Sequence, residues 1–172
     1  FFMITEWCVL GDCSHAECHN CFPVKDCSKN HEECNKNGTC PEIFKDSELK
    51  VLVTGCAGFI GSHVSEYLLK RGNYVLGIDN VNDYYDISVK EKNLEILKKY
   101  PKFEFRKEDI CDTTSISDWK PHKICHLASM AGVRYSIENP LAYINTNIIG
   151  FTHILEGCRQ NNIKHLVYAS SS

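Results

Sequence analysis

Short apolar runs alternate with stretches of helical periodicity from Lys50 onward. The runs KVLVTG (50–55) and YVLGID (74–79) are rich in β-branched residues and have the length of buried strands. Between them, the segment 58–72 has the pattern of a helix, and Gly72 stands where a helix stop is expected. The apolar residues that repeat at four-residue spacing in this helix are Ile60, Val64 and Leu68. The pattern predicts a strand, a helix and a second strand in succession.

The alternation continues to the last residue. Further expected elements are a helix at 90–100, strands at 103–110 and 123–129, a long helix at 139–162 and a strand at 164–172. On the long helix, the apolar residues on or near one face are Tyr143, Ile148, Phe151 and Leu155. Strands that alternate with helices imply right-handed crossovers and a parallel sheet covered on both faces. The predicted fold class is therefore α/β, a Rossmann-like doubly wound parallel sheet of at least five strands, preceded by a small Cys-rich irregular segment.

Length and composition fit one domain with a small appendage. The chain has 172 residues, of which 43% are hydrophobic and 24% charged, and no apolar stretch approaches the roughly 20 residues of a membrane span. A basic leader of the kind found in signal peptides is not visible. The net charge is −3, and residues 46–172 carry 15 charges of each sign, so a nucleic-acid or acidic-membrane surface is not indicated.

Cysteine divides the chain into two parts. Seven of the 11 cysteines lie in the first 40 residues, which contain few large apolar side chains. Such a segment cannot bury enough apolar area to order itself, so cross-links or a metal are expected. Disulfides are favoured over zinc, because zinc sites usually have two ligand pairs and a second CxxC is missing here. Zinc binding through CSHAECHNC (13–21) and reduced thiols remain alternatives. We predict a cross-linked segment at 1–45 and a separate domain at 49–172, with an odd cysteine available for a disulfide to another chain.

Candidate chemistry begins in VTGCAGFIGSH (53–63). Gly55, Gly58 and Gly61 follow a strand and open a helix, where a tight turn and close backbone approach to a pyrophosphate require residues without Cβ. Asp79 ends the next strand, 18 residues after Gly61, where a carboxylate can bind the adenosine ribose hydroxyls. An acid there repels a 2′-phosphate, so the pattern predicts NAD rather than NADP as the cofactor.

These motifs resemble a known family. VTGCAGFIGSH is similar to the TGxxGxxG fingerprint of the extended short-chain dehydrogenase/reductases, the NAD-dependent epimerase/dehydratase family, and the similarity continues across residues 50–172. Two segments, GIDNVNDYYD (77–86) and HLASMAGVRYSIENP (126–140), resemble the UDP-glucuronate 4-epimerases within it.

The resemblance implies roles for individual residues. The cofactor-binding residues would be Gly55, Gly58, Phe59, Ile60, Gly61, Asp79, Asn80, Asp109, Ile110, Leu127, Ala128, Ser129, Ala131 and Asn147. Arg134 would bind the substrate, and Ser171, followed by Ser172, would be the catalytic hydroxyl.

Several of these residues have simpler interpretations. Asp109 could be a turn acid and Arg134 a surface residue that caps the long helix. His126 is expected to be a satisfied core histidine rather than a ligand. Cys56 would place an oxidation-sensitive thiol beside the phosphate loop.

The family oxidises a sugar hydroxyl, typically at C4 of a UDP-sugar, and returns the hydride to the other face, with the tyrosine of a YxxxK motif as the base. No tyrosine here is followed by lysine four residues on, so we expect this motif beyond residue 172 and a chain that is not catalytically complete as given. The expected function is the NAD-binding portion of an epimerase-like protein that acts on a UDP-uronic acid or UDP-hexose.

Two alternatives remain. One is a non-catalytic structural protein, such as a virion-surface fibre with a Cys-rich anchor, and the other is an NAD-sensing module. A homo-oligomer is expected. The location would be cytoplasmic for an enzyme, and a virion surface or another oxidising setting for a disulfide-bonded segment.

Overall fold

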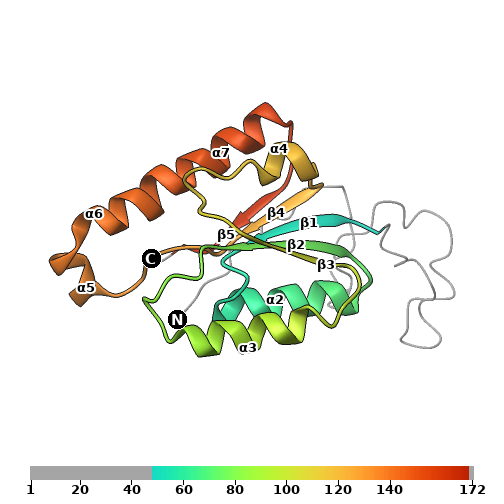
Figure 1. Cartoon of the computed structure of the whole chain (residues 1–172). Helices are drawn as coiled ribbons and strands as arrows, with labels where there is room; N and C mark the ends of the chain where they lie inside the picture. Colours follow the sequence, from blue (N-terminus) through green and yellow to red (C-terminus); the bar gives the residue numbers. More distant parts are fainter. Residues whose placement is uncertain (1–47, 171–172) are drawn as a thin grey trace, which may run out of the picture. The chain divides into compact units, whose positions relative to one another are not determined.

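Five parallel strands form the centre of residues 48–170, the part of the chain described by the structure, which is a computed structural model (Figure 1). The strands are β1 (Lys50–Thr54), β2 (Tyr74–Asp79), β3 (Phe103–Lys107), β4 (Lys123–His126) and β5 (Leu166–Tyr168). Their order in the sheet is β3-β2-β1-β4-β5, and every neighbouring pair is parallel. The chain thus builds outward from β1 in one direction and then in the other, which confirms the predicted Rossmann-like α/β fold.

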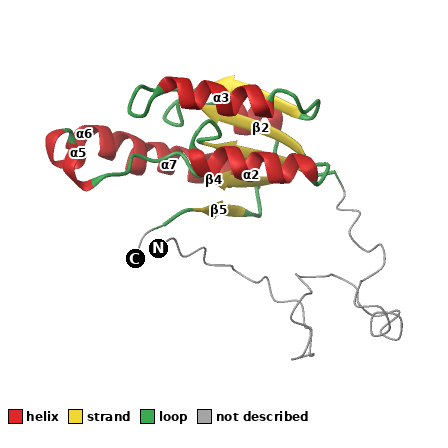
Figure 2. Ribbon diagram, turned by 90° about the horizontal axis from the view of Figure 1, so that it is seen from below, coloured by secondary structure: helices red, strands yellow, loops and turns green. Residues whose placement is uncertain are grey.

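Helices cover both faces of this sheet (Figures 1 and 2). One face carries α2 (Phe59–Lys70) and α3 (Ile87–Leu97). The other carries α4 (Ser115–Trp119) and α7 (Phe151–Gln160), and α5 (Val133–Glu138), α6 (Pro140–Tyr143) and the π-helix η1 (Ile144–Gly150) precede α7. None of the helices between residues 48 and 170 has both the length and the apolar character needed to cross a membrane.

The core lies in two layers, one on each side of the sheet. On the α2/α3 side, Val53 and Val75 pack with Leu69 and Leu97. On the α7 side, a second set is buried, consisting of Leu52, Leu76, Ile78, Ile110, Ile116, Ile124, Ile154 and Cys158. Adjacent residues of β1 and β2 therefore supply opposite layers, as expected for central strands buried on both faces.

Helix α2 occurs where it was predicted, but it turns a different face to the sheet. Its buried residues are Gly61, Ser62, Ser65 and Leu69, whereas Ile60 is 38% exposed. Small side chains on the inner face allow the helix axis to lie close to the strands. Of the apolar residues at four-residue spacing, Ile60 is exposed and Leu68 packs against the edge of the core, so the most buried face lies one position further along the helix.

The boundaries of α3 also differ from the prediction of 90–100. The helix begins at Ile87 because the carboxylate of Asp86 accepts a hydrogen bond from the Ser88 amide, 2.9 Å away, and so caps the first turn. It ends at Leu97, and residues 98–100 form a turn before Pro101.

The predicted long helix is a composite. The chain is helical from Pro140 to Gln160, but its middle, Ile144–Gly150, is a π-helix. The extra residue in each π turn changes which side chains face the sheet, so Gly150, Ile154 and Cys158 are buried while Ile148 is 60% exposed. Of the four apolar residues expected on or near one face, Ile148 and Leu155 are exposed, whereas Tyr143 and Phe151 are half-buried. The short helices α4 and α5 were not predicted.

Candidate functional site

The glycine turn after β1 is held in one conformation by the backbone around it. Gly55 has φ +69°, and its N–H donates to the Ile78 carbonyl at 2.8 Å. A Cβ on Gly55 would lie 2.8 Å from the Ala128 amide nitrogen, and one on Gly61 would lie 2.0 Å from the Gly55 oxygen. These two positions therefore require glycine. A Cβ on Gly58 would meet only the Gly55 oxygen, at 3.3 Å.

Helix α2 starts from this turn without a side-chain cap. Its N-cap residue is Gly58, and its first turn contains no acidic residue. The first N–H groups of a helix have no partner within the helix, so they can bind an anion. Phe59, at the same end, is 79% exposed. The turn therefore presents unpaired amides at the carboxyl end of β1.

Asp79, at the end of β2, is attached to the same turn. Its Oδ2 accepts a hydrogen bond from the Ala57 amide at 3.1 Å, and its Oδ1 accepts one from the Val81 amide at 2.8 Å. The residue is 8% exposed. The structure thus places the predicted ribose-binding carboxylate directly beside the predicted phosphate loop.

Asn80 extends this cluster to the end of β3. Its amide nitrogen donates to Asp109 Oδ2 at 2.9 Å, and the Cys111 amide donates to Asp109 Oδ1 at 3.0 Å. Burial disfavours the charged form of Asp109, but these hydrogen bonds outweigh it and hold the pKa of the carboxyl below its usual value. Ile110 is 5% exposed and packs against Gly150, so most of its side chain belongs to the core.

The loop after β4 is tied to β1 through Thr54, a residue that the sequence analysis did not single out. The Thr54 hydroxyl oxygen accepts hydrogen bonds from the amides of Leu127 and Ala128, both at 3.0 Å. It also contacts Nδ1 of His126 at 2.8 Å. The position of Thr54 directly before the first glycine of the motif could have indicated this role, since a hydroxyl there can bridge two parallel strands.

His126 is a core residue and not a ligand. It is 7% exposed, and its ring stacks on Phe151 with the centroids 5.1 Å apart. Burial lowers the pKa of its imidazole to about 4, so the ring is neutral at physiological pH. The expectation of a satisfied core histidine is consistent with these contacts.

Asn147 lies in η1 and clamps the same loop. Its side-chain oxygen accepts from the Met130 amide at 2.8 Å, and its side-chain nitrogen donates to the Met130 carbonyl at 2.9 Å. Ser129 and Ala131, on either side of Met130, are exposed. Asn147 therefore fixes the loop that carries these two residues, and its own polar atoms are engaged by the backbone.

Two tyrosines donate hydrogen bonds to the backbone of the residues that follow Met130 in this loop. Tyr84, from the loop after β2, donates to the Ala131 carbonyl, and Tyr143 donates to the Gly132 carbonyl at 2.6 Å. Arg134 is exposed on α5, the short helix that follows. The predicted catalytic residues Ser171 and Ser172 lie outside the described residues, as does the Cys-rich segment.

The environment of Cys56 differs from the sequence-based expectation of an oxidation-sensitive thiol beside the phosphate loop. Its side chain is completely buried in the core layer on the α2/α3 side of the sheet, where a Cβ on Gly77 would lie 2.5 Å from its sulfur. Burial, followed by the nearby Asp79 carboxylate, raises the pKa of the thiol. Because the thiolate is the reactive form of cysteine, burial and the raised pKa both disfavour oxidation of Cys56.

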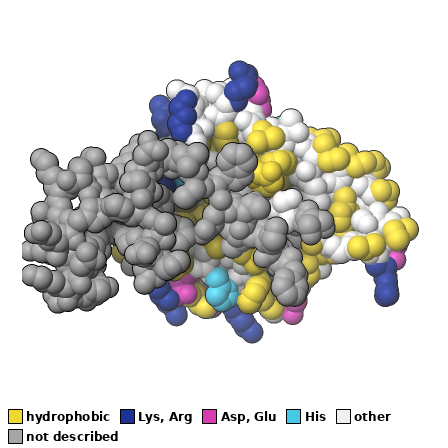
Figure 3. Space-filling view, turned by 180° about the vertical axis from the view of Figure 1, so that it is seen from behind, with side chains coloured by type: hydrophobic (Ala, Val, Ile, Leu, Met, Phe, Trp, Pro, Cys, Tyr) yellow, Lys and Arg dark blue, Asp and Glu magenta, His cyan; other side chains and the backbone are white. Residues whose placement is uncertain are grey.

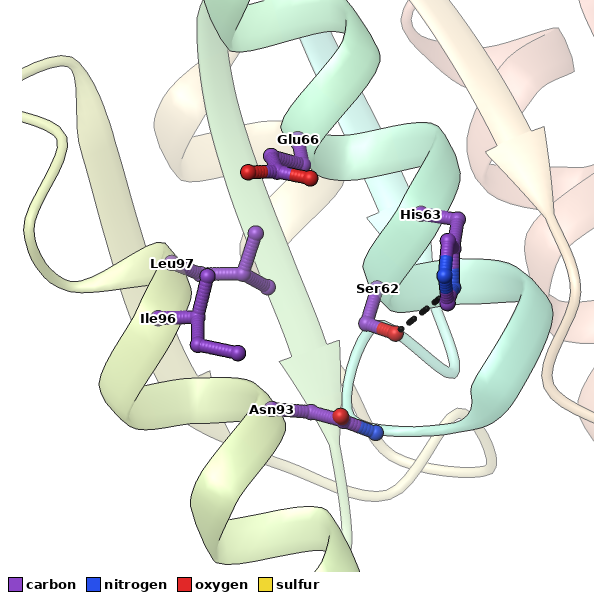
Figure 4. A pocket seen from close by; sticks show the side chains of 6 residues that line it. All are labelled: Ser62, His63, Glu66, Asn93, Ile96 and Leu97. Carbon is purple, nitrogen blue, oxygen red and sulfur yellow. Dashed lines mark hydrogen bonds between the residues drawn. The ribbon is translucent and has the colours of Figure 1, made fainter.

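A small hollow between α2 and α3 is separate from this site (Figure 4). It has a volume of about 60 Å³ and is lined by Ser62, His63, Glu66, Asn93, Ile96 and Leu97. Glu66 is already paired with Lys70 and accepts from Tyr100. A space of this size suits about two water molecules and no nucleotide. Within residues 48–170, no cluster of three or more His, Cys, Asp or Glu side chains could hold a metal ion.

The arrangement fits a dinucleotide. The glycine turn, Asp79, Asn80 and the loop after β4 meet at the carboxyl ends of the strands, where the sheet order changes direction between β1 and β4. Ligands of open α/β sheets bind at such a switch point. The glycines leave backbone exposed to a pyrophosphate, and the carboxylate suits a ribose diol.

Comparisons with known proteins agree with this geometry. The family model described as GDP-mannose 4,6 dehydratase matches residues 52–172. A UDP-glucuronate 4-epimerase of Thermodesulfobacterium geofontis is 46% identical over 125 residues, which cover 70% of this chain and 39% of that protein.

Solved structures give the same result. UDP-glucuronic acid 4-epimerase from Bacillus cereus, in complex with UDP-glucuronic acid and NAD, has a TM-score of 0.63 and 35% identity, covering 70% of this chain and 39% of that one. UDP-glucose 4-epimerase of Thermus thermophilus in complex with NAD has a TM-score of 0.58 and 33% identity, covering 69% and 36%. The chain spans less than two-fifths of the length of curated relatives that it matches.

Proposed function

We propose, because this chain belongs to the NAD-dependent epimerase/dehydratase family of extended short-chain dehydrogenase/reductases, that residues 49–172 are the NAD-binding portion of a sugar-nucleotide 4-epimerase. The proposed substrate is a UDP-uronic acid or a UDP-hexose, with oxidation and re-reduction at C4. Relatives named UDP-glucuronate 4-epimerase, at 44–48% identity, favour the uronic acid.

One contact carries the proposal: the hydrogen bond from the Ala57 amide to Asp79 Oδ2. It joins the residue proposed to bind the adenosine ribose to the turn proposed to bind the pyrophosphate. Two parts of a dinucleotide are therefore recognised by one rigid unit, and the cost of arranging them on binding is small.

The chain's own residues have separable roles in this proposal. The amides at the start of α2 bind the pyrophosphate, Asp79 and Asn80 receive the ribose, and Asp109 with Ile110 borders the adenine. The loop held by Thr54 and Asn147 positions Ala128, Ser129 and Ala131 on the nicotinamide side. When bound, NAD accepts a hydride from the sugar and returns it.

The substrate side is proposed from the family resemblance. Arg134 would contact an anionic group of the sugar nucleotide, since a guanidinium suits carboxylate and phosphate. Ser171, or Ser172 next to it, would donate a hydrogen bond to the reacting oxygen. No tyrosine in residues 1–172 has a lysine four positions later, so we assign the base to none of them.

The experiment is an assay of the protein together with whatever sequence follows residue 172 in its gene. We expect conversion of UDP-glucuronate into its C4 epimer, resolved by anion-exchange chromatography, with a lower rate on UDP-glucose. Asp79→Ala should weaken NAD binding and reduce turnover, while Lys92→Met, an exposed position on α3, should change neither.

Turnover of UDP-glucose alone would show that the uronic acid is the wrong substrate. Failure of the protein to convert either sugar nucleotide, with NAD bound, would contradict the epimerase proposal and leave a cofactor-binding protein without this activity.

A further inference from the structure

A buried lysine on α3 faces the ribose-binding carboxylate. Lys90 is 7% exposed, and its Nζ lies 3.6 Å from Asp79 Oδ1. The same nitrogen donates to Asn82 Oδ1 at 2.9 Å. Lysine is rarely buried to this extent unless it is paired with an opposite charge. The contact with Asp79 therefore compensates both charges within the site.

The hydrogen-bonding capacity of this pair is only partly used. Asp79 Oδ1 accepts the Val81 amide and Oδ2 accepts the Ala57 amide, while Lys90 Nζ is paired with Oδ1 by charge at 3.6 Å, beyond hydrogen-bond distance. Each carboxylate oxygen can accept about two hydrogen bonds, so each retains one. An ammonium group has three N–H donors, and among residues 48–170 one of those on Lys90 has an acceptor, Asn82 Oδ1. Both side chains thus keep hydrogen-bonding capacity at the place where a ribose would bind.

The charge of the pair changes the expectation from the sequence. Asp79 alone would repel a 2′-phosphate, and a lone buried acid would make the site strongly selective for NAD. With Lys90 beside it, the net charge of the two side chains is zero, and the ammonium attracts the same phosphate that the carboxylate repels. The balance between the two determines which ribose is accepted.

We propose that Lys90, paired with Asp79, is the specificity-determining residue that sets how strongly this site prefers an adenosine ribose with a free 2′-hydroxyl over one with a 2′-phosphate. The inference rests on the proposed binding of NAD at this site. It assigns to α3 a direct part in cofactor choice, in addition to the end of β2.

A purely structural role is the competing explanation. Lys90 could serve only to hold the loop after β2, through Asn82. In that case its removal would weaken the two dinucleotides by the same factor, because neither would contact it. The ratio of the two affinities therefore separates the explanations.

The experiment is a double-mutant cycle on the 172-residue chain, with NAD⁺ and NADP⁺ titrated by calorimetry. The variants are Asp79→Asn, Lys90→Met and their combination, with Lys92→Met as the matched control on the same helix. Lys90→Met should increase the preference for NAD⁺ about tenfold, since a charged hydrogen bond contributes about that much. Asp79→Asn should shift the preference toward NADP⁺ by a similar factor, and only while Lys90 is present.

Lys90→Arg keeps the positive charge and should leave the ratio at its wild-type value, so that a change in Lys90→Met can be assigned to the lost charge. The melting temperature of each variant, measured by circular dichroism, checks that the chain is folded. If Lys90→Met does not fold, Lys90→Gln, which removes the charge and keeps a polar side chain beside Asn82, takes its place in the cycle.

An unchanged ratio of the two affinities in Lys90→Met, with NAD⁺ still bound, would overturn the inference and leave the proposed function intact. A ratio that changes in Lys90→Arg as much as in Lys90→Met would overturn it as well, because the positive charge would then not be the cause. The inference would also be overturned, with the proposed function intact, if Asp79→Asn shifted the ratio equally with and without Lys90. Failure of the wild-type chain to bind either dinucleotide would overturn both.

Discussion

The hydroxyl group of Thr54 connects the two strands that flank the site. A hydroxyl has one donor and two acceptor positions. Both acceptor positions are used by the amides of Leu127 and Ala128, so the O–H donates to Nδ1 of His126. The proton on the histidine ring is therefore on Nε2.

Replacement of Thr54 should show how much the loop after β4 depends on this one group. Thr54→Val keeps the shape but leaves the Ala128 amide and His126 Nδ1 without this partner, while the Leu127 amide keeps the Thr54 carbonyl at 3.3 Å. The substitution should lower the free energy of unfolding by about 2 kcal/mol. Thr54→Ser retains the hydroxyl and is the matched control. Denaturant unfolding measures both, and equal stability of the two variants would contradict the assigned network.

Burial of His126 makes the stability of the protein depend on pH. The pKa of the folded imidazole, about 4, lies below its ordinary value of 6.5, so the unfolded chain binds a proton more readily. This contribution is complete above about pH 6.5 and is lost as the pH falls toward 4. Between pH 7.5 and 5 it should cost about 2 kcal/mol.

The loss should be smaller in His126→Gln, where burial still lowers the pKa of His165, and fully retained in His153→Gln, an exposed position on α7. Denaturant midpoints at several pH values would measure it. A pH dependence that is the same in both variants would show that His126 is not the group responsible.

Helix α2 illustrates what the sequence could and could not predict. The strand–turn–helix order and the glycine positions followed from the motif, because a tight turn has few solutions. The face of α2 that packs on the sheet could not be predicted in this way. The rule that apolar residues face inward assumes that there is room for them between helix and sheet. Here α2 approaches the strands closely, and Gly61, Ser62 and Ser65 take the inner positions.

The long helix was harder to predict for a similar reason. A π-helical stretch follows from tertiary contacts, including the clamp between Asn147 and Met130, and not from any local propensity. Helix α4 has five residues and α5 has six, too few to show a period. The sequence pattern places Lys90 in a helix but does not reveal its pairing, since its partner Asp79 is 11 residues away and on β2.

Close packing of α2 on its turn leads to a test with two glycines. Gly61→Ala would place a Cβ 2.0 Å from the Gly55 oxygen, so the helix must shift, at a cost of about 3 kcal/mol, and NAD affinity should fall. Gly58→Ala meets the same oxygen at 3.3 Å and should cost about 1 kcal/mol. Thermal unfolding compares them, and a reversed order would contradict the packing described.

Apolar side chains gather on one side of residues 48–170 (Figure 3). In the right-hand part of this view, where α5 and α6 lie, yellow side chains cover much of the visible surface. The exposed apolar residues of α5, α6 and η1 are Val133, Ile137, Leu141, Ile144, Ile148 and Ile149. A contiguous apolar area of this kind is typical of an interaction surface.

The expected homo-oligomer provides a test of this surface. We expect the wild-type chain to associate as its concentration rises, since self-association would bury these side chains. Ile137→Glu with Leu141→Glu should shift the equilibrium toward the monomer in analytical ultracentrifugation. Lys98→Glu and Lys99→Glu, exposed beyond the end of α3, are the control. Association unaffected by the apolar substitutions would place the interface elsewhere.

Binding of NAD⁺ to the 172-residue chain, measured by isothermal titration calorimetry, tests the central claim most directly. The glycine turn and Asp79 should bind one NAD⁺ per chain, and both Gly61→Ala and Asp79→Ala should weaken that binding at least tenfold, with Lys92→Met unchanged. Absence of binding, or binding that neither substitution in the site affects, would contradict the assignment of this site to the dinucleotide.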